Sequence, residues 1–539
     1  MIFLSGSQRI RRLGSVSNLV YFVLGSLCVV VVLGILTLRL RPNAVRGKVG
    51  QESVRIYCAA GVAKPVQRLI DEYNREFGTT VELVRTGGSG ELAGQIRTEF
   101  EAGIERGADL YITADDFLLE KAHREGIVAE RMPLAEQTAV IAVAADSTLP
   151  IGNMAELVER SGLRFGVASN RAAIGKIARK IAKREGLLEA LESRKTTDSE
   201  NVMTLAQSLV TGSLQAGIIW DTTVSQINLA SGNDGLKLKI AAYADKENQW
   251  RSNIAIGVLE RCSSPAAGLR FARYLTAPET GQEAFEDFGF KFIPGDHWEE
   301  IPEIHVYCGS MFTPVLEPTL REFANREGIN IYPRWEGCGK LVASMKATED
   351  PGLFPDAYLA CDKMFLDEVR DYFRVPIVLT NNRIVMAVRR ELKNRPSTPT
   401  DLLNGQLRIG LCDPVQSALG KLTQMLLTTS PYEGLYPKLH QSAAVVVDVG
   451  PTLISQLAAG GLDVAFVYRS NVMADPASKE KLVLVELDGA SQYSIATQPW
   501  AIAKSTRHPN VLNRLFLRIN REDIRHRFRD FGFKWVDTP

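Results

Sequence analysis

The second half of this sequence repeats the first, and no other feature constrains the fold as strongly. Short segments of 5 to 7 residues return in the same order, at an offset that falls steadily from 250 to 243 residues. Duplication followed by small loop deletions leaves such a drifting offset with the order kept. The matched pairs are Arg55–Ala59 with His305–Gly309, Gly88–Leu92 with Gly337–Leu341, Asp109–Asp115 with Asp356–Asp362, and Asp287–Phe292 with Asp530–Trp535. The chain therefore contains two copies of one unit.

Each copy alternates between strand-like and helix-like patterns. In the first copy, residues 54–60, 80–85 and 110–114 are short apolar runs typical of strands. Between them, apolar residues recur at helical spacing after Pro65, which suits a first helical turn, and again from Leu92 to Phe100. This βαβ alternation predicts an α/β fold with a doubly wound sheet. Ligands of such sheets bind beyond the carboxyl ends of the strands, beside helix N-termini.

The length indicates two lobes in each copy. A chain of 539 residues corresponds to three or four folding units at roughly 150 residues each. Long apolar strands at 132–143 and 378–388 lead into second lobes at about 140–245 and 386–490. We expect unit 1 at 54–295, a short acidic linker at 296–303, and unit 2 at 304–536, with the two units as close neighbours.

A membrane segment precedes the first copy. Leu19–Leu38 contains 20 residues without a charge, enough to span about 30 Å as a helix. A cleaved signal peptide is the alternative, but a small-x-small cleavage motif does not follow this stretch. We expect an uncleaved transmembrane anchor at 19–38, a cytoplasmic segment at 1–18 and a juxtamembrane linker at 39–53. Positive residues flank both ends, so charge does not decide the orientation.

Composition argues against several functions. Basic and acidic residues number 63 and 62, a balance that disfavours a nucleic-acid partner. The 7 cysteines and 6 histidines show no metal-ligand spacing in sequence, and we expect no cofactor. No nucleophile elbow accompanies a Ser/His/Asp order, so we do not expect an enzyme. The arginines between Arg514 and Arg529 are typical of a solvated helix face.

The sharpest chemical feature is the loop Gly87-Gly88-Ser89-Gly90-Glu91, between a strand and a helix. Glycines there permit positive φ and close backbone approach, so that N–H groups and the Ser89 hydroxyl point at one spot. The positive end of the helix adds to this, and the loop suits an oxyanion. It is not a Walker loop, because no Gly-Lys-Ser/Thr follows. An ordinary tight turn between strand and helix remains the alternative.

The order of five motifs resembles a known family. YCAAGVAKPV, TGGSGELAGQI, GADLYITADD, GIIWDTT and DFGFKF follow one another as in the periplasmic molybdate/tungstate-binding proteins. These proteins belong to the type II extracytoplasmic solute-binding superfamily. The resemblance covers residues 54–295 and, more weakly, 304–536. It implies two tandem bilobal units of the periplasmic-binding-protein type after one transmembrane helix, each able to close on a tetrahedral oxyanion held by neutral donors.

Site residues follow from the resemblance alone. The family's first hydroxyl position falls on Gly61, which lacks the donor, and its second on Ser89. Two backbone positions fall near Ile174 and Val202, and the family's Tyr falls on Trp220, which donates but does not accept. The second-copy equivalents are Ser310, Met311, Cys338, Leu419, Gly450 and Tyr468.

Four cysteines of the second copy fall at the carboxyl ends of expected strands. These are Cys308, Cys338, Cys361 and Cys412, and all four are expected to face the second cleft. Two readings stay open. They are small buried thiols that act as hydrophobic residues, or they form a disulfide or a soft-metal site.

These observations favour a binding protein tethered outside the cytoplasmic membrane. It would pass a small oxyanion to an ABC permease and ATPase on separate chains, because a single span forms no pore and no P-loop is present. The alternative is a sensory or scaffolding ectodomain with degenerate clefts and no transport role. An enzyme that uses the cysteines of copy two is a third reading.

Overall fold

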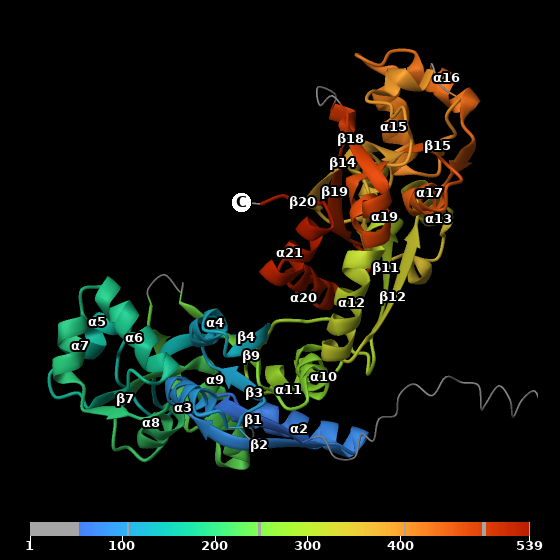
Figure 1. Cartoon of the computed structure of the whole chain (residues 1–539). Coiled ribbons are helices and arrows are strands. Elements are labelled where there is room, and N and C mark those ends of the chain that lie inside the picture. The colour runs from blue at the N-terminus through green and yellow to red at the C-terminus, as the bar shows by residue number, and fades with distance from the viewer. Residues whose placement is uncertain (1–52, 105–106, 246–249, 404–405, 488–491, 538–539) are drawn as a thin grey trace, which may run out of the picture.

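The computed structural model describes residues 53–104, 107–245, 250–403, 406–487 and 492–537 (Figure 1). The expected membrane segment at 19–38 and both segments that flank it before residue 53 lie outside this range. Within the described residues, no helix is both long enough and apolar enough to cross a membrane.

The first unit is built from strands and helices in alternation, as expected. Its strands are β1 (Ser53–Ala59), β2 (Thr80–Gly87), β3 (Leu110–Thr113), β4 (Val128–Ala144), β5 (Phe165–Ala168), β6 (Thr197–Ser199), β7 (Ala216–Trp220), β8 (Leu238–Tyr243), β9 (Arg251–Leu259) and β10 (Lys291–Phe292). Its helices are α2 (Ala63–Phe77), α3 (Ser89–Glu101), α4 (Asp116–Arg124), α5 (Met154–Glu159), α6 (Ala173–Arg184), α7 (Leu188–Arg194), α8 (Val202–Val210), α9 (Asp221–Ala230), α10 (Pro265–Thr276) and α11 (Gly281–Asp287).

The second unit repeats the pattern. Its strands are β11 (Glu303–Gly309), β12 (Asn330–Glu336), β13 (Ala357–Leu359), β14 (Ile377–Arg389), β15 (Ile409–Cys412), β16 (Val445–Val447), β17 (Val464–Tyr468), β18 (Leu482–Glu486), β19 (Ile495–Ile502) and β20 (Lys534–Trp535). Its helices are α12 (Thr313–Glu327), α13 (Cys338–Ala347), α14 (Lys363–Asp367), α15 (Ala418–Thr428), α16 (Leu435–Ser442), α17 (Gly450–Ala458), α18 (Arg469–Met473), α19 (Pro476–Lys481), α20 (Pro509–Ile519) and α21 (Glu522–Asp530).

Sheet topology confirms the duplication. The strand order is β2-β1-β3-β9-β4-β7-β5-β6 in the first unit and β12-β11-β13-β19-β14-β17-β15-β16 in the second. Position by position, these two orders are the same. β1 pairs in parallel with β2 and β3, but β9 runs antiparallel to both β3 and β4. The sheets are therefore mixed, because the chain returns from each second lobe along a strand rather than a helix.

One long strand in each unit joins its two lobes. In β4, Val128–Thr138 pairs with β9, whereas Ala139–Val143 pairs with β7. In β14, Ile377–Arg383 pairs with β19 and Ile384–Val388 with β17. Each lobe thus has its own part of the sheet, and β4 and β14 are the strands that pass from one part to the other.

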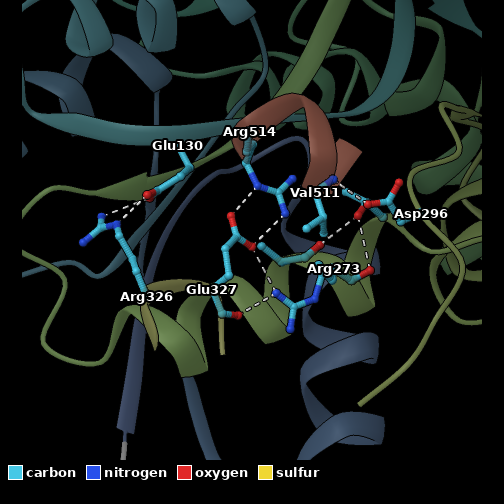
Figure 2. A network of polar contacts seen from close by, with 9 residues as sticks. Glu130, Arg273, Asp296, Arg326, Glu327, Val511 and Arg514 are labelled. Atoms are coloured by element: carbon cyan, nitrogen blue, oxygen red, sulfur yellow. Dashed lines mark hydrogen bonds and ion pairs between the residues drawn. The ribbon is translucent and has the colours of Figure 1, made fainter. Parts of the chain in front are cut away.

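The two units meet through helices of their first lobes. Helices α10, α12 and α20 pack together at the junction (Figure 1). There Glu327 lies between Arg514 and Arg273 (Figure 2). Arg514 is only 8% exposed, so the expectation of a solvated face is wrong at this position. The units are close neighbours, as the short linker predicted.

Candidate functional site

A small cavity lies between the lobes of unit 1. Its volume is about 20 Å³, room for one compact ligand a few atoms across or for one or two waters. None of the described residues that line it carries a charge. The lining residues are Ala59, Ala60, Gly61, Gly87, Gly88, Ser89, Ala114, Ala172, Ala173, Ile174, Asn201, Val202 and Trp220. All five residues that the resemblance implied for this copy lie together here.

Three helices begin at this cavity. Helices α3 and α6 start at the glycine loop and at Ala173, and no side chain caps the first turn of either helix. Helix α8 starts at Val202, and the Asn201 side chain accepts from the amides of Met203 and Thr204. Uncapped first turns leave backbone N–H groups without helical partners and carry the positive end of the helix dipole. The cavity is therefore electrostatically suited to an anion.

Ser89 is held in place by its neighbours. It is 2% exposed, and its Oγ accepts a 3.1 Å hydrogen bond from the Ala114 amide. Its carbonyl accepts from the Tyr111 hydroxyl, and burial raises the pKa of Tyr111 so that the phenol keeps its proton. Because its Oγ accepts from the protein, the Ser89 hydroxyl hydrogen remains available to donate to a ligand.

The lobes of unit 1 are closed across this loop. The Gly90 amide in the first lobe donates a 2.8 Å hydrogen bond to the Arg171 carbonyl in the second. A Cβ on Gly90 would lie 2.4 Å from that oxygen. Gly88 has a φ of −68°, and neither Gly87 nor Gly90 is left-handed. The expectation of positive φ was wrong. The glycines serve close backbone approach between lobes.

Unit 2 closes in the same way around a smaller cavity. The Gly339 amide donates a 3.1 Å hydrogen bond to the Gln416 carbonyl, and Lys340 pairs with Asp448. The cavity has a volume of about 10 Å³. Its lining, uncharged within the described part of the chain, is Ser310, Met311, Gly337, Cys361, Ser417, Leu419, Val449, Gly450, Pro451, Tyr468 and Asn471. Five of the six second-copy residues are present, and Cys338 is not.

Tyr468 is the most distinctive group of the second cavity. Its side chain is 3% exposed, and its hydroxyl has no hydrogen-bond partner in the part of the chain that is described. Its amide donates a 3.1 Å hydrogen bond to Asn471 Oδ1. Burial raises the pKa of Tyr468, so the hydroxyl stays protonated. A buried phenol without a partner is a donor ready for a ligand.

The four cysteines do not share one cavity surface. Only Cys361 lines the cavity, with Cys338 directly behind it at 2.8 Å between the sulfurs. The contact with Cys338 and burial raise the pKa of Cys361 well above its ordinary value. Cys308 and Cys412 are buried elsewhere in the core, and burial raises the pKa of each. Among described residues, no group of three or more His, Cys, Asp or Glu side chains is arranged to hold a metal ion.

Both halves of the chain match one protein family. The sequence model of the family described as "Bacterial extracellular solute-binding protein" matches residues 54–291 and again residues 304–534. The chain belongs to this family. It carries two copies of the family's domain, and the cavities described above lie one in each copy of this solute-binding fold.

Individual proteins resemble a single copy. A Haemophilus influenzae protein named as a binding protein is 24% identical over 236 residues, which is 44% of this chain and 89% of that protein. The Azotobacter vinelandii periplasmic molybdate-binding protein is 16% identical, with a TM-score of 0.37, over 44% of this chain and 98% of that one. Iron-bound HitA from Pseudomonas aeruginosa is 18% identical, with a TM-score of 0.38, over 45% of this chain and 86% of that one.

Several cavity residues of this solute-binding protein were not predicted from its sequence. Asn201 stands just before an apolar helical run, the pattern of an N-cap, and this would have placed it at the helix start. Ala172 and Ala173 carry no such pattern in the sequence. In unit 2, Ser417 is the N-cap residue of α15 and was open to the same argument, whereas Asn471 lies inside α18 and was not.

Proposed function

We propose that this solute-binding protein holds a small tetrahedral oxyanion, of the molybdate or tungstate type, in the cleft of unit 1. The observation that carries the proposal is an uncharged cavity at which three helices begin, two of them without a side-chain cap. Neutral donors bind a dianion through oriented dipoles, and each charge-assisted hydrogen bond contributes about 1.5–3 kcal/mol. Ser89 and the first amides of α6 and α8 supply those donors.

The same lining disfavours a metal cation as the ligand. Hard and borderline cations in proteins take carboxylate, imidazole, phenolate or thiolate ligands. The described lining of the unit 1 cavity has none of these groups. The helix dipoles would also repel a cation there. An oxyanion is therefore the ligand class that this cavity supports.

We further propose that the protein delivers its ligand to an importer. Family membership supports a place outside the cytoplasmic membrane. The uncharged stretch at 19–38 is the proposed single anchoring helix, and only the sequence supports it. The ABC permease and ATPase are then separate chains. External protease on spheroplasts should release a soluble fragment that begins near Arg41, and a fully protected chain would refute this placement.

Three features of the second cavity favour a different role for unit 2. Its cavity has half the volume of the first, and Met311 and Leu419 fill part of its wall. Pro451 also removes an amide donor from the first turn of α17. These features support the alternative that unit 2 is a sensory or scaffolding module with a degenerate cleft.

Calorimetry with molybdate, tungstate, sulfate and phosphate tests the proposal. Ser89→Ala should weaken oxyanion binding by about 10- to 100-fold, the effect of one lost charge-assisted hydrogen bond. Thr98→Ala is the matched control, because Thr98 lies on the exposed face of the same helix. Absence of heat with all four anions would favour the scaffolding role for the whole chain.

A further inference from the structure

A further cavity lies at the junction of the two units, away from both clefts. Its volume is about 120 Å³. Strand β4 and helix α10 of unit 1 line one side, and helix α20 of unit 2 lines the other. The polar groups that matter here are Arg131, Arg273, Asp296, Asn513 and Arg514. A cavity of this size accommodates a small ligand or several waters.

Arg273 is the least satisfied of these groups. It is 5% exposed, and its Nη1 donates to the Glu327 carbonyl at 2.8 Å and to the Glu327 carboxylate at 3.3 Å. Its Nε and Nη2 have no hydrogen-bond partner among the described residues. Burial lowers the pKa of Arg273 to about 10, although Glu327 opposes this shift. A buried guanidinium with three of its five N–H donors unused is costly unless another group accepts from them.

The second arginine is better satisfied but shares the same carboxylate. Arg514 donates to the two Glu327 oxygens at 2.6 and 2.9 Å, through Nε and Nη2 (Figure 2). One buried carboxylate therefore serves two buried guanidinium groups. These three side chains together carry a net charge of +1, and the charge of Asp296 also acts on both arginines.

The other charged side chains that line the cavity also have partners. Asp296 is the acidic residue of the lining, and its carboxylate accepts from the amides of Asn510 and Val511 at 2.7 and 2.9 Å. Arg131 lies 3.5 Å from Asp116, with both side chains partly exposed. The lining thus holds three arginines and one aspartate, and the carboxylates of Glu327 and Asp116 lie beside these arginines.

We propose that the junction cavity binds a small multi-oxygen anion, a carboxylate or a phosphate-type ion, on Arg273 and Arg514. Two planar guanidinium groups recognise such oxygens through paired N–H donors. Because Arg273 belongs to unit 1 and Arg514 to unit 2, the bound anion ties the units together. The site is independent of the proposed clefts and of their ligand.

The test uses the full chain with inorganic phosphate, sulfate and citrate at constant ionic strength. Binding is measured by calorimetry, and its location by hydrogen–deuterium exchange of α10 and α20. Asn513→Glu puts a negative charge at the exposed rim without touching the Glu327 contacts, and Arg131→Gln removes a rim cation. Arg321→Gln is the control, because Arg321 is highly exposed and pairs only with Glu317 in the described chain.

We expect at least one of the three anions to protect α10 and α20. Asn513→Glu should weaken that binding about tenfold or more, and Arg131→Gln should weaken it less. Arg321→Gln and Ser89→Ala should leave it unchanged. Tighter binding of phosphate than of citrate would identify a phosphate-type ion as the ligand, and tighter binding of citrate would identify a carboxylate. The junction site would be overturned if no anion protected either helix. It would also be overturned if the protection were lost in Ser89→Ala but kept in Asn513→Glu. Either result would leave the cleft proposal standing.

Discussion

Gly90→Ala should prevent the closure of unit 1 without altering any group that faces the ligand. The new Cβ would lie 2.4 Å from the Arg171 carbonyl oxygen, and real Cβ atoms are essentially never closer than 3.0 Å to such a neighbour. The lobes must therefore move apart at this point. The change loses the Gly90–Arg171 hydrogen bond, about 1 kcal/mol, and adds an overpacking cost of about 1–3 kcal/mol.

These costs fall on the closed form, which is the form that binds. Their sum of about 2–4 kcal/mol predicts a loss of affinity of about 30- to 1000-fold, measured by calorimetry. Gly94→Ala is the matched control, because a Cβ there meets no atom within 4 Å on the same helix. It should stabilise α3 by up to about 1 kcal/mol and leave affinity unchanged. Equal affinity for the Gly90→Ala variant and the parent would refute the closure argument.

Three further predictions concern the junction and the thiols. Glu327→Gln should lower the free energy of unfolding in urea by about 3–5 kcal/mol, because two buried guanidinium groups lose their carboxylate. Glu322→Gln on the same helix should cost less than about 1 kcal/mol, since its two arginine partners are exposed or partly exposed; equal losses would contradict the role of burial. Burial raises the pKa of Glu327, but the charges of Arg514 and Arg273 outweigh it and lower that pKa overall. Its stabilising contribution should therefore be complete above the unfolded pKa of about 4.3 and be lost as pH falls through the lower folded pKa. Acid titration of Glu327→Gln should show a weaker loss, and identical profiles would be inconsistent with this. Finally, oxidised glutathione should convert the Cys338 and Cys361 thiols to a disulfide, with two reduced glutathiones as products. With a sequence separation of 23 between the two positions, the bond should stabilise the chain by about 3 kcal/mol. Mass spectrometry that finds both thiols free would contradict the disulfide reading.

The fold was largely predictable because its information is local and repeated. The apolar runs at 54–60, 80–85 and 110–114 became β1, β2 and β3, and the helix periodicity after Pro65 became α2. The internal repeat then fixed the second unit. Strand direction was less accessible, since the residues of β9 that pair with β3 lie 142 to 148 positions later in the chain and no local pattern reports that β9 runs antiparallel.

The site was only partly predictable. Resemblance placed Gly61, Ser89 and Trp220, and the structure brings them to one cavity. Sequence did not reveal why Gly90 is glycine, because the Arg171 carbonyl comes from another lobe. The prediction that Cys308 and Cys412 face the cleft was wrong for a related reason. At the end of a strand, a shift of one residue in register decides whether a side chain points into the core or into the cleft.

The buried contacts at the junction could not be predicted from the sequence. Arg514 sits in a helix with an exposed basic pattern, and its burial depends on Glu327, 187 residues earlier, and on Arg273 from the other copy. Nothing near Arg514 in the chain distinguishes it from the solvated arginines that follow. The packing of α10, α12 and α20 against one another is what buries Arg514.

The location of a bound tungstate ion in crystals of this protein tests the central claim most directly. Anomalous scattering would give the position of the metal without reference to the protein model. The account predicts a peak in the unit 1 cavity, within hydrogen-bonding reach of the Ser89 hydroxyl and the first amides of α6 and α8. An ion found elsewhere, or a cleft filled by protein side chains in the presence of tungstate, would contradict it.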